Sequence, residues 1–208
     1  MFEIIKVDLK RKLTFFNTNA HPGRKSYQHA ENPFWNSLRV LLEPGTLAVI
    51  LFRFGKWALK FRSPWIRRPL LCIHFVINIF FMFIGIHIQL ESEIGKGFMI
   101  HNYSGIFVLA ERIGENFTVN QGVVIGRLRG RPHDAIIGDN VYFASGAMAF
   151  GDVKIGNNVA VGANSLVAMS VPDNCTVLGV PARIIMRKAT SPYLKLVLPE
   201  DKDKSANA

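Results

Sequence analysis

The C-terminal half of the chain repeats an apolar residue at multiples of six positions. From residue 94 onward, six Ile-Gly or Val-Gly pairs are separated by 19, 12, 12, 18 and 6 residues. An amphipathic helix would repeat about every 3.6 residues and a half-buried strand about every two. The observed period fits neither. It indicates a solenoid, in which each short strand buries its apolar residue by stacking on the next coil.

The positions between these pairs continue the repeat. The predicted inward-facing residues are Ile88, Ile94, Ile100, Ile106, Ile113, Val119, Ile125, Ile137, Phe143, Ala149, Ile155, Val161 and Val167. We predict a mainly β fold, a parallel β-helix over residues 86–185, with Gly, Asn and Asp turning its corners. Residues 127–134 lack an inward apolar residue and are expected to project as a loop, where binding groups concentrate. Residues 186–208 are expected to form a partly disordered extension.

Residues 1–85 are predicted to be an α-helical N-terminal region. Shorter helices are expected at residues 3–15 and 34–42. In the next helix the apolar residues recur at helical spacing, with Thr46 as the expected N-cap and Arg53 on the polar side.

One apolar segment is long enough to cross a bilayer. Residues 70–88 carry no formal charge and follow Arg67 and Arg68. Against a membrane span, His74 and Asn78 lie inside the segment. Three interpretations remain open: a membrane span, peripheral membrane contact, or a helix that is buried or faces a trimer partner.

The excess of positive charge is concentrated near the N-terminus. Residues 1–70 hold 13 Lys or Arg against 4 acids, which suits an anionic membrane or a partner protein. No zinc spacing or aromatic-basic motif is present, so no nucleic-acid partner is expected. Cys72 and Cys175 form no disulfide framework and are expected to be buried thiols. With no apolar signal segment in the first 30 residues, we predict a cytoplasmic protein, with the inner membrane face as an alternative location.

Several segments resemble the serine acetyltransferase family of hexapeptide-repeat acyltransferases. They are Glu43-Pro-Gly-Thr-Leu-Ala48 with Phe52-Arg53, Ile94-Gly-Lys-Gly-Phe-Met-Ile100, Ser104-Gly-Ile-Phe-Val108, Asn120-Gln-Gly-Val-Val-Ile-Gly126 and Val177-Leu-Gly-Val-Pro-Ala-Arg183. The resemblance implies a left-handed coil and a homotrimer, with coenzyme A between coils of neighbouring subunits. It also implies transfer of an acetyl group from acetyl-CoA to a hydroxyl, without a metal.

The family carries Asp-His after Ile-Gly-x-Gly, and the His acts as general base. Here the corresponding residues are His101-Asn102. When the two sequences are aligned on Ser104-Gly-Ile, His101 lies one position before the family's His. When positions are counted back from Ile113 instead, His101 has the same spacing as the family's His. His87 occupies the place of the acid that orients the base. His101, Asn102 and His87 are therefore the catalytic candidates, and a solvated corner residue is the alternative for His101.

Candidates for acceptor binding come from the predicted loop. The family has an Arg-His pair that faces the acceptor's carboxylate, and this chain has Arg131 and His133-Asp134. An Asp there would repel a carboxylate. The acceptor is therefore predicted to be either L-serine or a sugar hydroxyl of a surface polysaccharide.

Candidates for coenzyme binding lie farther along the chain. Small residues at Ser145, Gly146 and Ala163 would let the pantetheine arm approach the backbone. Arg183 and Lys188 are candidates for the 3′-phosphate.

Two other functions were weighed for this fold. The first is a non-catalytic trimeric scaffold or membrane-associated partner that kept the fold and lost the base, and His101-Asn102 supports it. A zinc hydratase would need three converging imidazoles. The spacings of His87, His101 and His133 are 14 and 32 residues, which are not multiples of six, so no zinc site is expected.

Overall fold

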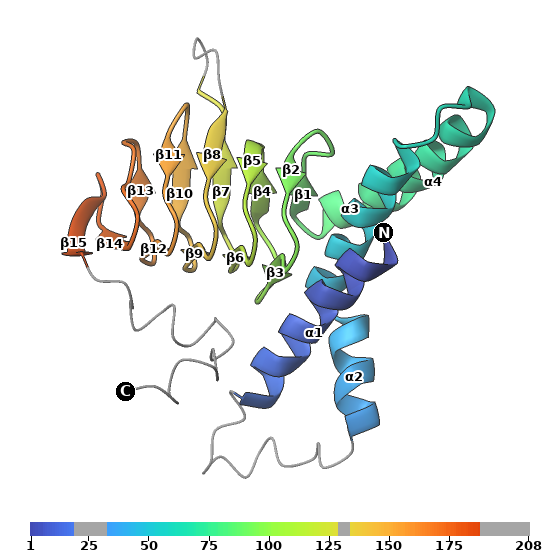
Figure 1. Cartoon of the computed structure of the whole chain (residues 1–208), viewed down its shortest axis with the longest axis horizontal. Coiled ribbons are helices and arrows are strands. Elements are labelled where there is room, and N and C mark those ends of the chain that lie inside the picture. Colours follow the sequence, from blue (N-terminus) through green and yellow to red (C-terminus); the bar gives the residue numbers. More distant parts are fainter. Residues whose placement is uncertain (19–32, 129–133, 188–208) are drawn as a thin grey trace, which may run out of the picture.

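A computed structural model describes residues 1–18, 33–128 and 134–187 (Figure 1). Four helices precede a parallel β-helix in this part of the chain: α1 (Phe2–Thr18), α2 (Pro33–Leu42), α3 (Pro44–Ala58) and α4 (Pro64–Phe83). Figure 1 shows α1 lying across the β3 end of the β-helix, while α3 and α4 run side by side away from it.

The strands form three sheets, which are the faces of the β-helix. The first face contains β1 (Ile86–Ile88), β4 (Ile106–Val108), β7 (Val124–Gly126), β10 (Met148–Phe150) and β13 (Leu166–Val167). The second contains β2 (Glu93–Ile94), β5 (Ala110–Ile113), β8 (Ala135–Ile137) and β11 (Lys154–Ile155). The third contains β3 (Met99–Ile100), β6 (Thr118–Val119), β9 (Tyr142–Phe143), β12 (Ala160–Val161), β14 (Cys175–Leu178) and β15 (Arg183–Arg187). Within these faces all described pairings are parallel except β14 with β15.

The predicted inward residues form the core. All thirteen are buried, with at most 8% of their surface exposed. On the second face, for example, Ile94 pairs with Ile113, Ile113 with Ile137, and Ile137 with Ile155. Each coil thus supplies one apolar residue per face to a continuous column, which confirms the solenoid predicted from the period of six.

One assignment within the repeat is wrong. Ile106 is buried, but it pairs with Ile86, whereas Val108 pairs with Ile88 and holds the repeat position. The corner after Ile100 is therefore longer than the regular repeat allows, and the following step to β5 is shorter. A register shift between Ala110 and Arg112 accompanies this change. The irregular spacing seen in the sequence thus arises at the corner that carries His101.

Asparagines turn the corner between the second and third faces. Asn116, Asn140, Asn158 and Asn174 have φ of 57°, 57°, 55° and 60°. Their side chains form a ladder, in which each amide donates to the next carbonyl oxygen at 2.9, 3.0 and 2.9 Å. Asn tolerates this left-handed conformation better than most residues. The sequence pattern Ile-Gly-x-Asn is the local signature of the corners at Asn116, Asn140 and Asn158.

Two predictions about α3 are wrong. The helix begins at Pro44 and its N-cap is Glu43, because proline at the first helical position fixes φ favourably. Thr46 lies inside the helix, buried, and its hydroxyl oxygen has no hydrogen-bond partner among the residues that the structure describes. Arg53 does not lie on a polar outer side but is only 6% exposed, because it is held by the ion pair and carbonyl groups described below.

The apolar segment 70–88 is not a single helix. It supplies the end of α4, and the strand β1 begins at Ile86, because Gly85 has a φ of 82° and breaks the helix. Only His74 and Phe81 of α4 are buried, so burial within the chain is excluded for most of this segment. Cys72 is exposed on α4, in contrast to the expected buried thiol, while Cys175 is buried. By length and apolar composition alone, α4 would suffice to cross a membrane.

Candidate active site

The corner between the third and first faces gathers five of the eight predicted site residues that the structure describes. Here the backbone N–H groups of Gly122, Gly146 and Asn164 donate to the carbonyls of Ser104, Gln121 and Ser145, each at 2.9 Å. We call this the corner edge, comprising residues 101–105, 120–122, 144–146 and 162–164. His101 and Asn102 lie on its first step, Ser145 and Gly146 on its third, and Ala163 on its fourth. The stacking of coils thus places residues up to 62 positions apart on one edge.

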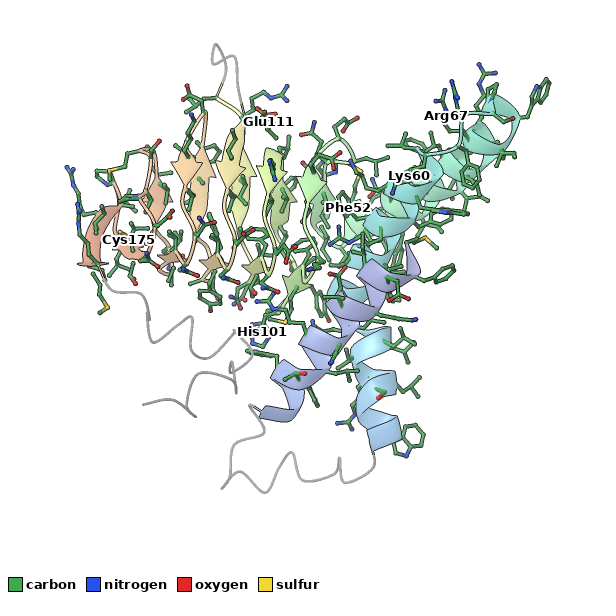
Figure 2. All side chains as sticks on the ribbon, viewed as in Figure 1. Phe52, Lys60, Arg67, His101, Glu111 and Cys175 are labelled. Carbon is green, nitrogen blue, oxygen red and sulfur yellow. The ribbon has the colours of Figure 1, made fainter. Side chains whose placement is uncertain are left out.

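His101 lies where α1 meets the corner edge. Its backbone N–H donates to the carbonyl of Val119 at 2.9 Å, which fixes the start of the corner. Its ring meets that of Phe15 edge to face, with 4.5 Å between the centroids. The side chain is half-buried under the C-terminal part of α1, as Figure 2 shows. His101 is therefore held in place rather than freely solvated.

The surroundings of His101 favour the neutral imidazole. Burial, the larger cause, and the positive charge of Lys12 lower the pKa of His101 below its ordinary value of 6.5. At neutral pH the ring can therefore accept a proton. Within the described part of the chain no carboxylate is paired with it. Asn102 is exposed, and its amide cannot serve as a base at neutral pH.

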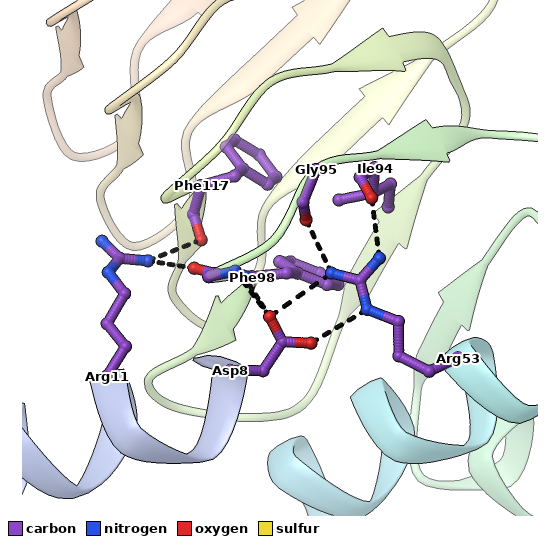
Figure 3. A network of polar contacts seen from close by, with 8 residues as sticks. Asp8, Arg11, Arg53, Ile94, Gly95, Phe98 and Phe117 are labelled. Carbon is purple, nitrogen blue, oxygen red and sulfur yellow. Dashed lines mark hydrogen bonds and ion pairs between the residues drawn. The ribbon is translucent and has the colours of Figure 1, made fainter. Parts of the chain in front are cut away.

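A buried ion pair fixes α1 and α3 to the first coil (Figure 3). The carboxylate of Asp8 accepts hydrogen bonds from the backbone of Gly97 at 2.6 Å and Phe98 at 3.0 Å, and from Nε of Arg53 at 2.9 Å. Arg53 also donates to the carbonyls of Ile94 and Gly95, at 2.7 and 2.6 Å. Both side chains are almost fully buried, and these bonds satisfy most of their polar atoms.

Two further cations of α1 complete this attachment. Arg11 donates to the carbonyls of Gly97 and Phe117, the latter at 3.1 Å, and to the hydroxyl of Thr118 at 2.8 Å. Lys12 donates to the carbonyl of Ile100, the residue before His101, and pairs with Glu43 at 2.7 Å. The network therefore determines where Phe15 and Lys12 lie relative to His101.

The sequence analysis missed this network. Asp8, Arg11, Lys12 and Phe15 follow the spacing of one helical face, and that spacing was the available signal. Charged side chains usually mark a solvated face, so this spacing alone does not predict burial. In the structure this face is buried because the carbonyl groups at the end of the β-helix need donors.

His87 occupies a different part of the surface from His101. It lies on β1 of the first face, and its ring is 6.1 Å from that of Phe107. Its Nδ1 is buried and has no hydrogen-bond partner among the described residues. The structure shows no contact between His87 and His101 in the part that it describes. Their joint catalytic role remains a prediction.

Asp134 is engaged at the base of the predicted loop. Its carboxylate accepts two hydrogen bonds from Arg127, at 2.6 and 2.5 Å. The guanidinium of Arg127 compensates the negative charge of Asp134. Asp134 is therefore no longer expected to repel an acceptor carboxylate. Arg131 and His133 lie outside the described residues.

The coenzyme candidates differ in their surroundings. Ala163 is exposed and Ser145 half-buried, so both are accessible on the corner edge. Gly146 has a φ of 71°, and a Cβ there would lie 2.1 Å from Oδ1 of Asn164, so the turn itself requires glycine. Arg183 is exposed at the start of β15, where it pairs with Leu178, while Lys188 lies outside the described residues. No cluster of metal-ligating side chains occurs among the residues that the structure describes.

Known proteins share both sequence and fold with this chain. Serine acetyltransferase of Staphylococcus aureus strain Mu50 is 44% identical over 108 residues, which cover 50% of this chain and 50% of that protein. The Synechococcus elongatus enzyme of the same name is 34% identical over 158 residues, covering 73% and 62%. The chain thus spans about half the length of the curated relatives that it matches first. No family model matches the sequence.

Solved serine acetyltransferases have the same architecture. The Neisseria gonorrhoeae protein in complex with serine superposes with a TM-score of 0.62 at 25% identity, covering 88% of this chain and 68% of that one. The Brucella abortus protein in complex with coenzyme A gives 0.67 at 23% identity, covering 91% and 69%. The superposition confirms the left-handed parallel β-helix with a helical N-terminal region. In sequence and in fold, the chain is similar to serine acetyltransferases, whose left-handed parallel β-helix it shares.

Proposed function

We propose that this chain is an acetyl-CoA-dependent O-acetyltransferase. The observation that carries the proposal is the corner edge, where a half-buried, neutral imidazole and small accessible residues of later coils lie in one line. L-serine is the first acceptor to consider, because the relatives are named serine acetyltransferases and one was solved with serine. A sugar hydroxyl of a surface polysaccharide is the second acceptor of this proposal.

The proposed reaction needs one group that both accepts and returns a proton. His101 removes the proton of the acceptor hydroxyl while its oxygen attacks the thioester carbonyl. The C–S bond then breaks, the acetyl group stays on the acceptor oxygen, and the imidazolium gives its proton to the leaving thiolate. Ser145 and Ala163 line the path of the coenzyme along the edge, and Arg183 binds its phosphate.

Release of free thiol from acetyl-CoA tests this proposal. We expect release by the purified chain with L-serine or with a member of a sugar panel. His101→Ala should lower kcat by about 10²–10⁴-fold, because it removes the proton acceptor. Asn102→Ala serves as the matched control and should retain most activity. Equal activity in wild type and His101→Ala would disprove the role of His101.

A non-catalytic scaffold is the alternative function. Its support is the position of Asn102 where the family carries its base, together with the contact of His101 with Phe15. If no acceptor releases thiol while coenzyme A still binds, the scaffold function is favoured.

The proposal includes a cytoplasmic homotrimer. On the outer side of the first face, Phe107 pairs with Val124, Val124 with Met148, and Met148 with Leu166. Phe107 is 43% exposed, and the others are partly exposed. An outward apolar column across parallel coils supports burial against another subunit.

A further inference from the structure

We infer that α4 docks on an anionic membrane, lying in the plane of the interface with its outer apolar face inserted. This inference is independent of the proposed catalytic activity. It rests on three observations: the orientation of the polar residues of α4, the distribution of charge around it, and the length of its uncharged part.

The polarity of α4 is the reverse of that of a helix on a soluble protein. Its inner side, toward α3 and β1, carries His74, Asn78 and Phe81, which line one cavity with Phe52. Val76, Phe80 and Phe83 each follow one of these three residues by two positions. They therefore lie about 200° around the helix, on its outer side. These three side chains are 67%, 61% and 87% exposed. Polar groups thus face the protein and large apolar groups face outward, as lipid contact requires.

The charges near α4 are all of one sign. Residues 44–90 contain no Asp or Glu. Lys60, Arg62, Arg67 and Arg68 are exposed around the α3–α4 connection, and none has an ion pair within the described part of the chain. Figure 2 places Lys60 and Arg67 on the part of the helical pair that points away from the β-helix. Trp65, 90% exposed, lies among them, as aromatic residues do at lipid interfaces.

The whole of α4 is long enough to cross a membrane, but its uncharged part is short and favours an in-plane position. Arg67 and Arg68 lie near its start, which leaves residues 69–83 as the uncharged part. At about 1.5 Å per residue this part is about 22 Å long, shorter than the roughly 30 Å hydrocarbon core. Moreover, α3 runs beside α4 and is anchored to the β-helix through Arg53. An in-plane helix keeps these contacts and inserts only its outer side.

The same positive charges argue against contact between α4 and the α4 of a second copy of the chain. Two α4 helices in parallel contact would bring the basic residues of one copy close to those of the other, with no acid in residues 44–90 to compensate them. Anionic lipid supplies that compensation. Basic residues next to an apolar face are the features that direct a helix to such a surface.

Cosedimentation of the full chain with lipid vesicles tests the inference. We expect binding to vesicles with about 30% phosphatidylglycerol and much weaker binding to pure phosphatidylcholine. Arg67→Glu with Arg68→Glu should weaken binding at least about 30-fold, and Val76→Ser with Phe83→Ser at least about tenfold. The matched controls are Lys154→Glu and Ile185→Ser, exposed residues on the β-helix, which should bind like wild type. Equal binding by all variants, or no binding, would overturn the inference.

Cys72 allows the position of α4 to be measured directly. It is exposed on α4 while Cys175 is buried, so an environment-sensitive fluorophore should label it selectively. We expect a blue shift only on addition of anionic vesicles, with stronger quenching by shallow than by deep nitroxide lipids. A blue shift without vesicles that grows with protein concentration would instead show that a second copy covers α4. Stronger quenching by deep lipids would contradict the in-plane position.

The vesicle assays do not depend on catalysis. Thiol release measured without lipid should be unchanged in Val76→Ser with Phe83→Ser, because α4 contributes no residue to the corner edge. For the wild-type chain, thiol release without vesicle binding would overturn the membrane inference alone, and vesicle binding without thiol release would overturn the proposed function alone.

Discussion

At the scale of single residues, the most informative side chain is His101. Its ring is confined by Phe15 from α1, and Lys12 on the same helix acts on its charge. His101 has no carboxylate partner among the described residues. Its pKa, and so its strength as a base, depends on burial and on the positive charge of Lys12. This arrangement differs from one in which an acid orients the base, because a carboxylate would raise the pKa rather than lower it.

The pH dependence of acetyl transfer follows from this arrangement. Burial and Lys12 lower the pKa of His101. We therefore expect kcat/KM to fall on acidification with a midpoint below pH 6.5, and to be constant near pH 7. Lys12→Gln should move that midpoint upward, because it removes the positive charge and retains a donor for Glu43. A pH profile of thiol release for both proteins provides the measurement. A wild-type midpoint above 6.5 would contradict the described surroundings of His101.

At the scale of secondary-structure elements, the corners of the β-helix have their own stabilising interactions. Asn140 donates to Asn158, accepts from Asn116 and has a φ of 57°. Asn140→Ala should reduce the free energy of unfolding by about 2–4 kcal/mol, through two lost hydrogen bonds and a strained backbone. Asn140→Gly should cost about 1 kcal/mol less, because glycine adopts this φ freely. Urea unfolding at fixed protein concentration measures both, and identical losses would exclude a contribution from φ.

The contact between α1 and the β-helix depends on a buried ion pair. Arg53→Met should destabilise the fold by about 3–5 kcal/mol, because it leaves the Asp8 carboxylate buried and unpaired. Adding Asp8→Asn should restore part of that loss, since the amide oxygen still accepts from the backbone of Gly97 and Phe98. Urea unfolding, with hydrogen exchange of α1 amides, provides the measurement. A double variant less stable than Arg53→Met would show that the charge of Asp8 is not the cause.

At the scale of the whole molecule, the two exposed apolar surfaces have different surroundings. The column on the first face lies on the rigid β-helix and includes His87 beside Phe107. The outer side of α4 lies beside the exposed residues Lys60, Arg62, Arg67 and Arg68, which have no ion pair among the described residues. We therefore assign the first to subunit contact and the second to lipid.

Disruption of the first-face column should separate the subunits. Phe107→Lys is expected to reduce the mass in light scattering from three times the 23.3 kDa chain mass to a single chain. A lysine there would place an unpaired charge in an apolar contact. Lys154→Glu on the second face is the control and should leave the assembly intact. An unchanged mass for Phe107→Lys would exclude this column as the subunit contact.

The sequence by itself determined the solenoid. A period of six admits no other regular arrangement, and each inward position from Ile113 to Val167 is buried as predicted. The local signals at the corners, Gly and Asn, were equally clear because the backbone conformation there depends on the residue itself. The candidate site was partly predictable for the same reason, since the repeat places Ser145 and Ala163 one coil apart.

Only the tertiary structure decided the features that depend on contacts between distant elements. The enlarged corner at His101 became visible through the pairing of Ile88 with Val108, which local spacing does not determine. The burial of Arg53 depends on carbonyl groups 41 and 42 residues away, and that of Asp8 on backbone N–H groups 89 and 90 residues away. Helical periodicity therefore could not distinguish this face from a solvated one. Likewise, the apolar composition of residues 70–88 predicted a segment that could contact a membrane. Only the packing of α4 on α3 showed which side of the helix faces outward.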